Sequence, residues 1–460
     1  MARHTTAVVG GGCAGVLAAT QLLRCTDSDV ILIDPDGPGG GVAYDAAQPW
    51  HLLNSRAGAM SAHPDDPGHF VAWARADGQA ATADTFLARR TYGRYLRDVA
   101  DAADAAAPGR LRVVRERVTG VAAHDTGVTV RAGDGLLHAD RAVLAVGNPA
   151  GAQPLGAPAG HPAYIADPWR PDAFAAVPAD GPVLLVGTGL TAVDVALTLA
   201  TRGHRGPVVA VSRRGLLPQA HTAAGAPPAL PDLDPAAGLA GLLHTLHAAA
   251  CGAPDWRTVV DGLRPHLDRL WTGLTPAEQD RFLRHAARQW ENHRHRMAPG
   301  IAAQVAWLRA EGALEVRAGT LAAVAADGAA LTVTLADGTT TRYAAVVNCA
   351  GPGRLPAAAG PLVGALLTAG AARVGPHGLG LDVDAAGSLI TAAGTAEPKL
   401  TVVGSLRRGR VWETTAVPEI RAQAAALAAA SPAAWTATPP AAPAPTPAPT
   451  PAAEGWPVAA

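Results

Sequence analysis

The sequence predicts an α/β protein built from two copies of one architecture, because distant segments of the chain resemble each other. Residues 6–23 have the pattern of a buried strand, a glycine-rich turn and a helix, and residues 182–199 repeat it. A second block, of three short strands linked by turns rich in Asp and Gly and then a buried strand ending in glycine, occupies 111–149 and again 314–352. We therefore expect two Rossmann-like domains of the three-layer ββα type, each with a β-meander insertion.

The segments outside these copies set the expected domain boundaries. The first domain should span residues 1–155, and the second should span 156–350 with a helical insertion at about 217–300 that the first copy lacks. Residues 351–430 should return to the first domain. Residues 431–460 are rich in Pro and Ala, cannot bury a core and should form a disordered tail.

One helix of the insertion has a clear start. Thr275 to Glu278 form a capping box with proline at the first helical position. Phe282, Leu283 and Trp290 follow on one apolar face, so this helix should continue through Trp290.

Charge and cysteine spacing exclude several classes of protein. The net charge of −1 argues against nucleic-acid binding, and no apolar run reaches the ~20 residues that a membrane span needs. Glycines interrupt the apolar stretch after Arg3, so export is not expected. The four cysteines form neither a C-x-x-C pair nor a metal-ligand cluster, which excludes dithiol–disulfide reductases and predicts no metal site. A cytoplasmic protein is favoured.

The first glycine-rich turn matches a dinucleotide-binding fingerprint. Gly10, Gly12 and Gly15 fit G-x-G-x-x-G between a strand and a helix. The first permits the tight turn, the second lets a pyrophosphate approach the backbone, and the third allows close packing of helix and strand. The next strand ends in Asp34, close to the separation of about 20 residues expected for a carboxylate that binds ribose hydroxyls.

The second turn differs at the end of its following strand. Gly187, Gly189 and Ala192 fit G-x-G-x-x-A, but Arg213 and Arg214 stand where a carboxylate is expected. Guanidinium groups beside the ribose suit a 2′-phosphate, which predicts NADPH; two solvated arginines are the alternative. Hydride transfer from nicotinamide to flavin requires two such sites, so the first turn is assigned to FAD.

Beyond the glycine turns, residues 5–428 resemble the two-dinucleotide-domain flavoproteins. The resemblance is closer to a bacterial FAD/NAD(P)-binding group that includes FAD-dependent urate hydroxylase-type proteins and is related to flavin N-hydroxylating monooxygenases. Asp34 departs from the glutamate more usual in the family, and the Baeyer–Villiger fingerprint is not intact at 160–169, which argues against ketone oxygenation. The more specific shared segments are GGGVAY (39–44), HLLNSRAGAMSAHPDDPGHFVAW (51–73), RRTYGRYL (89–96), HRHRMAP (293–299) and GRVWETTAVPEIRAQA (409–424).

The resemblance implies further cofactor-binding residues. Segments 51–73 and 89–96 would line the FAD site, and the glycine-ended strands at 143–149 and 346–352 would contact the cofactors. A helix beginning within 414–418, capped by one of its threonines, would direct its positive end at the flavin. Besides the residues named above, the predicted cofactor-binding set contains Asn54, Arg90, Tyr92, Val118, Gly147, Thr191, Gly351, Gly404, Trp412, Thr414 and Thr415.

Asn54 and His295 are the catalytic candidates. The Asn54 amide could hydrogen-bond the cofactor or a bound oxygen species, although a loop asparagine is also a common turn former. His295 belongs to the HRHR sequence at 293–296, which could clamp a substrate carboxylate or a cofactor phosphate, or simply satisfy the last carbonyls of its helix. His221 is a candidate lid residue near the nicotinamide.

The resulting hypothesis is an FAD-dependent, NADPH-consuming monooxygenase that acts through a C4a-(hydro)peroxyflavin, with the helical insertion excluding water. The resemblance implies N-oxygenation of a small amine or amino acid, or hydroxylation of a heterocycle such as urate. An NADPH-linked flavin reductase for a quinone or redox protein, and a non-catalytic flavin-binding regulatory protein, are the alternatives. The expected partners are a small-molecule substrate and O2, without nucleic acid or membrane, and homo-oligomerisation stays open.

Overall fold

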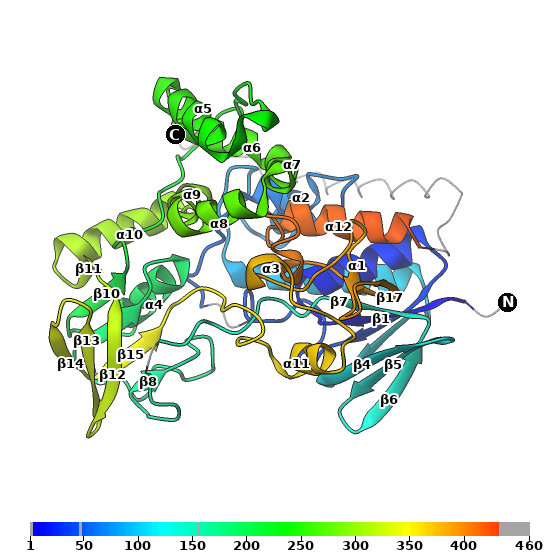
Figure 1. Ribbon diagram of the computed structural model, residues 1–460, viewed down its shortest axis with the longest axis horizontal. Coiled ribbons are helices and arrows are strands. Elements are labelled where there is room, and N and C mark those ends of the chain that lie inside the picture. The colour runs from blue at the N-terminus through cyan, green and yellow to red at the C-terminus, as the bar shows by residue number, and fades with distance from the viewer. Residues whose placement is uncertain (1–2, 46–47, 155, 432–460) are drawn as a thin grey trace, which may run out of the picture.

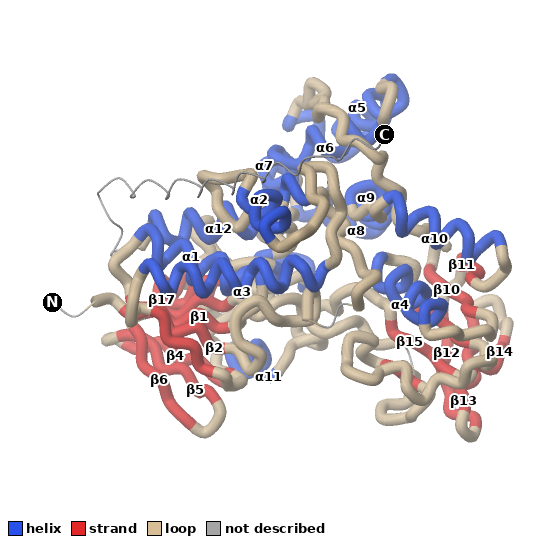
Figure 2. The backbone as a smooth tube through the Cα atoms, turned by 180° about the vertical axis from the view of Figure 1, so that it is seen from behind, coloured by secondary structure: helices blue, strands red, loops and turns tan. Residues whose placement is uncertain are grey.

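The computed structural model describes residues 3–45, 48–154 and 156–431 and contains two α/β domains with a helical insertion above them (Figure 1). The predicted tail lies outside the described residues apart from Ser431. Each domain has a parallel sheet with helices on one face and a three-stranded meander on the other (Figures 1 and 2). This confirms the predicted fold of two Rossmann-like ββα domains.

The first domain is built on a six-stranded sheet in the order β16-β17-β7-β1-β2-β3, parallel except at the β16–β17 pair. Side chains alternate along a strand, so Val8 of β1 faces the helices while Ala7 and Val9 face the meander. The last two strands in the chain, β16 and β17, follow the second domain in the sequence and complete the sheet of the first domain. The strands are β1 (Thr5–Val9), β2 (Asp29–Ile33), β3 (Leu111–Val114), β7 (Arg141–Leu144), β16 (Ser388–Ile390) and β17 (Ala396–Val402), and the meander is β4 (Val118–His124), β5 (Gly127–Ala132) and β6 (Gly135–Ala139).

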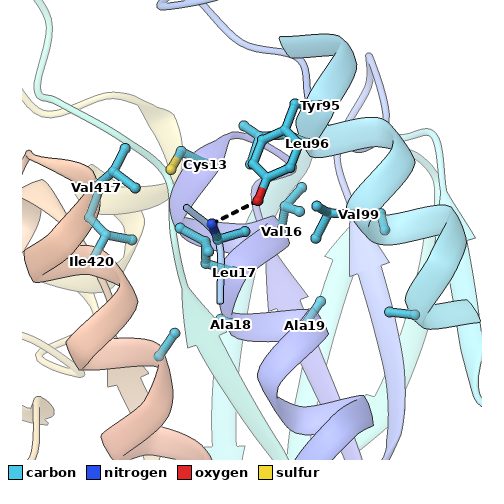
Figure 3. Packing of buried hydrophobic residues seen from close by; sticks show 14 of the residues in the cluster. Cys13, Val16, Leu17, Ala18, Ala19, Tyr95, Leu96, Val99, Val417 and Ile420 are labelled. Carbon is cyan, nitrogen blue, oxygen red and sulfur yellow. Dashed lines mark hydrogen bonds between the residues drawn. The ribbon is translucent and has the colours of Figure 1, made fainter. Parts of the chain in front are cut away.

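The helical layer of the first domain packs around α1, which follows the first glycine turn. Figure 3 shows Val16 and Leu17 of α1 between Val99 of α3 and Ile420 of α12. Ala and Leu dominate the α1 sequence, and ten of its residues are buried, so it forms the centre of the layer. The helices are α1 (Cys13–Cys25), α2 (His69–Ala76), α3 (Arg89–Ala106), α11 (Pro361–Thr368), which packs on the meander side, and α12 (Val417–Ala429).

The second domain repeats this arrangement with a smaller sheet. Its five strands are parallel and follow the order β11-β10-β9-β15-β8. Helices α4 and α10 cover one face and the β12–β14 meander covers the other. The bounds are β8 (Tyr164–Ile165), β9 (Val183–Val186), β10 (Val208–Ser212), β11 (Leu314–Ala318), β12 (Leu321–Asp327), β13 (Ala330–Leu335), β14 (Thr340–Tyr343), β15 (Ala345–Asn348), α4 (Leu190–Thr201) and α10 (Pro299–Ala310).

The helical insertion contains five α-helices. The predicted capping box at Thr275 and Glu278 is confirmed at the start of α8. The prediction of one helix through Trp290 is wrong, because the chain breaks at Ala286 (φ −110°, ψ −30°) and α9 begins there with a changed direction. The helices are α5 (Gly238–Gly252), α6 (Trp256–Leu263), α7 (Leu267–Gly273), α8 (Pro276–His285) and α9 (Ala287–Arg294).

The insertion is tied to the returning segment of the first domain. The Arg264 guanidinium donates to the Glu419 carboxylate at 2.6 and 2.5 Å, which anchors α6 and α7 to α12. The Trp271 indole donates to the Gly409 carbonyl oxygen at 2.8 Å. These contacts place the helical insertion over the junction between the two domains (Figure 1).

A buried polar cluster joins the two domains directly. Arg89 at the start of α3 pairs with Asp194 of α4, with Nη1 and Oδ2 2.7 Å apart, and the Asp194 side chain is only 5% exposed. His51 Nε2 lies 2.9 Å from the Thr198 hydroxyl of the same helix. The second domain is thus held against the first by groups that are costly to separate. Within the described residues, no helix is long and apolar enough to cross a membrane.

Candidate active site

The first glycine turn has a backbone that only glycine can adopt. Gly10 has φ +107°, and a Cβ atom there would lie 2.4 Å from the Ala145 carbonyl oxygen. A Cβ atom at Gly15 would lie 1.7 Å from the Gly10 carbonyl oxygen, so the third glycine lets α1 pack on the turn. Gly12 is the N-cap of α1, and no side chain caps this helix end. Its free N–H groups suit a pyrophosphate.

The second glycine turn resembles the first in its backbone angle, its close carbonyl contact and its uncapped helix. Gly187 has φ +119°, and a Cβ atom there would lie 2.5 Å from the Cys349 carbonyl oxygen. A Cβ atom at Gly10 would approach the Ala145 carbonyl oxygen in the same way. Gly189 is the N-cap of α4, again without a side-chain cap. Thr191 lies half-buried in the first turn of α4, and Ala192 is buried where the first turn has its third glycine. Both turns therefore fit a dinucleotide pyrophosphate.

The two turns differ in what lies over them. At the first, segment 39–41 is close: the Gly39 N–H donates to the Gly11 carbonyl oxygen at 2.8 Å. A Cβ atom at Gly12 would lie 3.8 Å from the Gly40 carbonyl oxygen. A cofactor at the first turn would therefore lie beside this glycine segment, which carries no bulky side chain at the contact.

Asp34 holds the first turn through one carboxylate oxygen and its own loop through the other. Oδ2 accepts the Gly11 N–H at 2.7 Å and Oδ1 accepts the Asp36 N–H at 2.9 Å. Asp34 follows β2 and is half-buried beside the turn. Its contact with a ribose stays a prediction, and its contact with the glycine backbone is an additional role that the spacing did not indicate.

Arg213 and Arg214 follow β10, but they point to different partners. The Arg214 guanidinium donates to the His285 carbonyl oxygen at 2.9 Å, at the last turn of α8. Arg213 is exposed, and among the described residues its guanidinium makes no hydrogen bond. Arg213 is therefore the member of the pair that is available for a ribose phosphate.

The residues assigned from the resemblance fall into two groups. Four of them are exposed, whereas Val118, Trp412 and Thr414 are buried. The predicted threonine cap of the last helix is wrong, because Ala416 is the N-cap of α12 and no side chain caps it. The Gly404 N–H, at φ +93°, donates to the Gln423 side-chain oxygen at 2.8 Å. The exposed group consists of Arg90, Gly147, Gly351 and Thr415.

Tyr92 lies deeper than a cofactor ligand normally does. Its ring is fully buried, 5.1 Å from the Tyr44 ring and 5.1 Å from the Phe70 ring. Tyr44 follows segment 39–41 in the chain, so Tyr92 packs against a residue next to the loop that covers the first turn. Cys13 lies beneath both rings, and burial raises the pKa of its thiol to about 12. This thiol is a packing group.

Asn54 and His221 connect the first domain to the insertion. The His221 Nε2–H donates to the Asn54 carbonyl oxygen at 3.0 Å, and the imidazole packs on Phe86 with ring centroids 5.0 Å apart. Burial, with Arg296 nearby, lowers the pKa of His221 to about 4. His221 is thus neutral near pH 7 and fixes the loop that carries Asn54.

The HRHR motif divides into residues with separate partners. Only His293 satisfies a helix carbonyl, with Nδ1 2.8 Å from the Gln289 oxygen. Arg294 donates to Glu413 at 3.0 Å, and both side chains are buried. His295 lies among Arg294, Glu291 and Arg408, and burial lowers its pKa to about 4. Within the described residues no contact joins His295 to Asn54.

Arg296 lines a small cleft of about 20 Å³ at the junction of the insertion and the first domain. Arg296 pairs with Asp261 and is only 2% exposed, yet its Nε and Nη1 atoms have no hydrogen-bond partner among the described residues. Buried donors of this kind normally have an acceptor. The guanidinium groups of Arg56, Arg257 and Arg296 converge on this cleft, where Asp255 and Asp261 already pair with two of them. It is lined by Arg56, His221, Thr222, Gly225, Ala226, Asp255, Arg257, Thr258, Asp261 and Arg296.

Arg288, the second residue of α9, lies at the second glycine turn and was missed in the sequence. Its Nη2 donates to the Thr188 hydroxyl at 3.2 Å and to the Leu216 carbonyl oxygen at 3.0 Å. Its Nη1 lies 3.8 Å from where a Cβ atom of Gly189 would stand. No spacing in the sequence relates the insertion to the second turn, so only the fold could reveal this contact. Among the described residues no group of acidic, His and Cys side chains could hold a metal ion.

Two glycine turns of similar geometry, each between a strand of a parallel sheet and the helix that follows it, give this chain a fold with two dinucleotide-binding domains. The resemblance predicted from the sequence is confirmed: residues 7–149 match the family model described as FAD-NAD(P)-binding. The chain is also 29% identical over 267 residues to L-aspartate N-monooxygenase (nitrosuccinate-forming) from Streptomyces davaonensis. That match covers 46% of this chain and 41% of the relative, so the chain matches about two fifths of the relative's length.

Solved structures share the whole fold at low sequence identity. The ornithine N-hydroxylase of Kutzneria sp. 744 has a TM-score of 0.64 and 13% identity, over 93% of this chain and 98% of its own. The cadaverine monooxygenase DfoA of Erwinia amylovora, solved with FAD, has a TM-score of 0.65 and 14% identity, over 93% and 94%. These likenesses concern the fold alone.

Proposed function

We propose that this protein is an FAD-dependent, NADPH-consuming monooxygenase that N-oxygenates an amino acid. The observation that carries the proposal is the pair of glycine turns, Gly10 to Gly15 and Gly187 to Ala192, in two domains held together by Arg89 and Asp194. FAD would supply electron relay and the activation of dioxygen, and NADPH would supply the hydride. The chain itself would hold both carriers, exclude water and orient the amine.

The chain offers a distinct set of groups to each carrier. The uncapped first turn of α1 would hold the FAD pyrophosphate, with segment 39–41 closing over it. The uncapped first turn of α4 would hold the NADPH pyrophosphate, and Arg213 would bind the 2′-phosphate. Asn54, kept in place by His221, would donate its amide at the flavin edge.

The arginine-lined cleft supports an amino acid as the substrate. The guanidinium groups of Arg56, Arg257 and Arg296 line the cleft, and such groups pair with carboxylates. Nearby guanidinium groups also lower the pKa of a bound amine, which favours the free base that attacks an electrophilic oxygen. The matched relative acts on L-aspartate by its name, and we extend this to an amino acid with a second carboxylate for the present chain.

The decisive experiment gives the FAD-loaded protein NADPH, labelled dioxygen and one of four probes: L-aspartate, L-ornithine, cadaverine or urate. We expect labelled oxygen on the nitrogen of L-aspartate, measured by mass spectrometry, in proportion to NADPH consumed. Labelled urate product alone would support heterocycle hydroxylation. If NADPH consumption yields only hydrogen peroxide or a reduced quinone, the result would support an NADPH-linked flavin reductase. If NADPH does not bleach the flavin, the result would support a non-catalytic flavin-binding regulatory protein.

A paired variant tests the cleft. Arg296→Gln should raise the KM for L-aspartate about tenfold or more, because it removes a charged donor that pairs with a carboxylate. Arg309→Gln removes the same charge from α10, away from the cleft, and should leave the KM unchanged. Equal effects of the two substitutions would contradict the placement of the carboxylate.

A further inference from the structure

The helical insertion contributes a guanidinium group to the second glycine turn, whereas the charged group that contacts the first turn is the Asp34 carboxylate. Arg288 reaches the second turn from α9, and among the described residues apart from those adjoining Gly189 its Nη1 is the one heavy atom within 4 Å of the Cβ position at Gly189. In the fingerprint, this second glycine is where the pyrophosphate approaches the backbone. The free end of Arg288 thus faces the side of the turn where a phosphate would bind.

The hydrogen bonds of Arg288 fix its direction and leave donors free. Nη2 is used by the Thr188 hydroxyl and the Leu216 carbonyl oxygen, and among the described residues Nε and Nη1 have no partner. Thr188 is 1% exposed and its hydroxyl also lies 2.8 Å from the Ser212 hydroxyl, at the end of β10. Arg288 is therefore held by the same network that joins the glycine turn to the strand preceding Arg213.

The charges around Arg288 leave a positive surplus at the turn. Burial lowers the pKa of Arg288, Glu291 raises it, and the nearby Arg213 lowers it. The Glu291 carboxylate is engaged by Arg408, with Oε1 and Nη2 2.7 Å apart. Arg213 itself makes no hydrogen bond among the described residues. Two guanidinium groups close to an uncapped helix N-terminus, with the nearest carboxylate already paired, form a site for an anion with several charges.

We infer that Arg288 is a pyrophosphate ligand of the second dinucleotide site, so that the helical insertion forms one wall of that site. The inference rests on the proposed function, since it takes the ligand to be a nicotinamide dinucleotide. Arg288 and Arg213 then divide the ligand between them: Arg288 binds the pyrophosphate common to NAD+ and NADP+, and Arg213 binds the 2′-phosphate found only in NADP+.

Calorimetric titration of the FAD-loaded protein tests this division without any turnover. The probes are NADP+, NAD+ and adenosine 2′-monophosphate, which has the 2′-phosphate but neither phosphate of the pyrophosphate. Arg288→Gln keeps a donor for Thr188 and Leu216 while removing the charge, and it should weaken the binding of NADP+ and NAD+ by a similar factor of about 10 to 100 and leave the binding of adenosine 2′-monophosphate unchanged. Arg213→Ala should weaken the binding of NADP+ and adenosine 2′-monophosphate and leave that of NAD+ unchanged.

The matched control is Arg284→Ala, which removes an exposed arginine of α8 and should change none of the three affinities. The melting temperature and flavin content of each variant establish that it is folded. Unchanged NAD+ and NADP+ affinities in Arg288→Gln would overturn the inference. Equal weakening of adenosine 2′-monophosphate and NADP+ binding in that variant would place Arg288 at the 2′-phosphate and would also overturn it. If the unaltered protein binds none of the probes, the proposed function fails first.

Discussion

The two glycine turns have nearly the same backbone but different surroundings. Gly10 and Gly187 have φ +107° and +119° and approach a neighbouring carbonyl oxygen in the same way. Uncharged backbone at 39–41 covers the first turn, whereas Arg288 of the insertion faces the second. The repeated architecture sets the turn geometry, and segments added outside the repeat set the charge that a ligand meets.

The largest expected effects come from alanine at the first glycine of each turn. Both positions combine a positive φ with a Cβ contact below 3 Å. Each substitution should therefore lower the affinity for the dinucleotide at its own turn more than about 100-fold, or ~3 kcal/mol. Gly10→Ala should give a colourless protein. Gly187→Ala should keep its flavin, measured by absorbance, but NADPH should no longer bleach it.

This pair of variants can break the comparison. Loss of flavin from Gly187→Ala would mean that the second turn does not act as a separate site. Retention of flavin by Gly10→Ala would mean that the first turn is not the FAD site.

The next largest effect concerns the ion pair between Arg89 and Asp194, which joins the two domains that carry the glycine turns. Arg89→Ala leaves the Asp194 carboxylate buried without its partner, and should lower the free energy of unfolding by about 3–5 kcal/mol in urea titrations. Replacing both residues, Arg89→Met with Asp194→Leu, should lower it much less. The control Arg205→Ala breaks an exposed pair with Asp180 and should leave the urea midpoint nearly unchanged. Equal midpoints for Arg89→Ala and the control would show that the pair does not join the domains.

A smaller effect depends on pH. Burial lowers the pKa of His221, between the first domain and the insertion, and of His63, in the first domain, to about 4 in both cases. Unfolded histidines bind protons near pH 6.5, so stability should be greatest above that pH and should fall as the pH drops from 6.5 to 4. Each group should account for about 1–2 kcal/mol after allowance for solvent screening.

Two histidine variants test how much each region contributes to the acid side of the stability profile. His221→Gln keeps a donor for the Asn54 carbonyl oxygen and should flatten the acid side of the stability profile. His63→Gln should flatten it by a similar amount. An unchanged profile in both variants would show that other groups control acid stability.

The smallest effect distinguishes the two arginines after β10. Arg213→Ala should weaken NADPH about tenfold relative to NADH, because its guanidinium has no other partner among the described residues. Arg214→Ala should change this preference less than about twofold, because Arg214 is engaged at the His285 carbonyl oxygen. Reversed results, measured by NADPH and NADH titration, would exchange their roles.

Local patterns predicted the repeated parts of the molecule well. Strand, turn and helix follow one another within a few residues, so Gly10, Gly187 and the capping box at Thr275 could be found from spacing alone. The helix break at Ala286 could not, because its residues are compatible with a continuous helix and tertiary packing decides the direction of α9.

Contacts between segments that are distant in the chain could not be predicted from the sequence. Arg288 meets Thr188 across 100 residues, and Arg89 meets Asp194 across the two domains. A buried ion pair leaves no periodic signal, and an arginine near a helix start looks like any surface residue. Tyr92 shows the same limit, since the motif that contains it is on α3 but its ring is turned into the core.

The anchoring of the insertion at α12 has a consequence for how the two carriers bind. Arg264 ties the insertion to Glu419 of the first domain, and Arg288 brings the same insertion to the second turn. A shift of α12 on loading of one carrier would therefore reach the pocket of the other. Thermodynamic linkage then requires reciprocity. If bound FAD changes the affinity for the nicotinamide carrier by some factor, the bound nicotinamide carrier changes the affinity for FAD by the same factor.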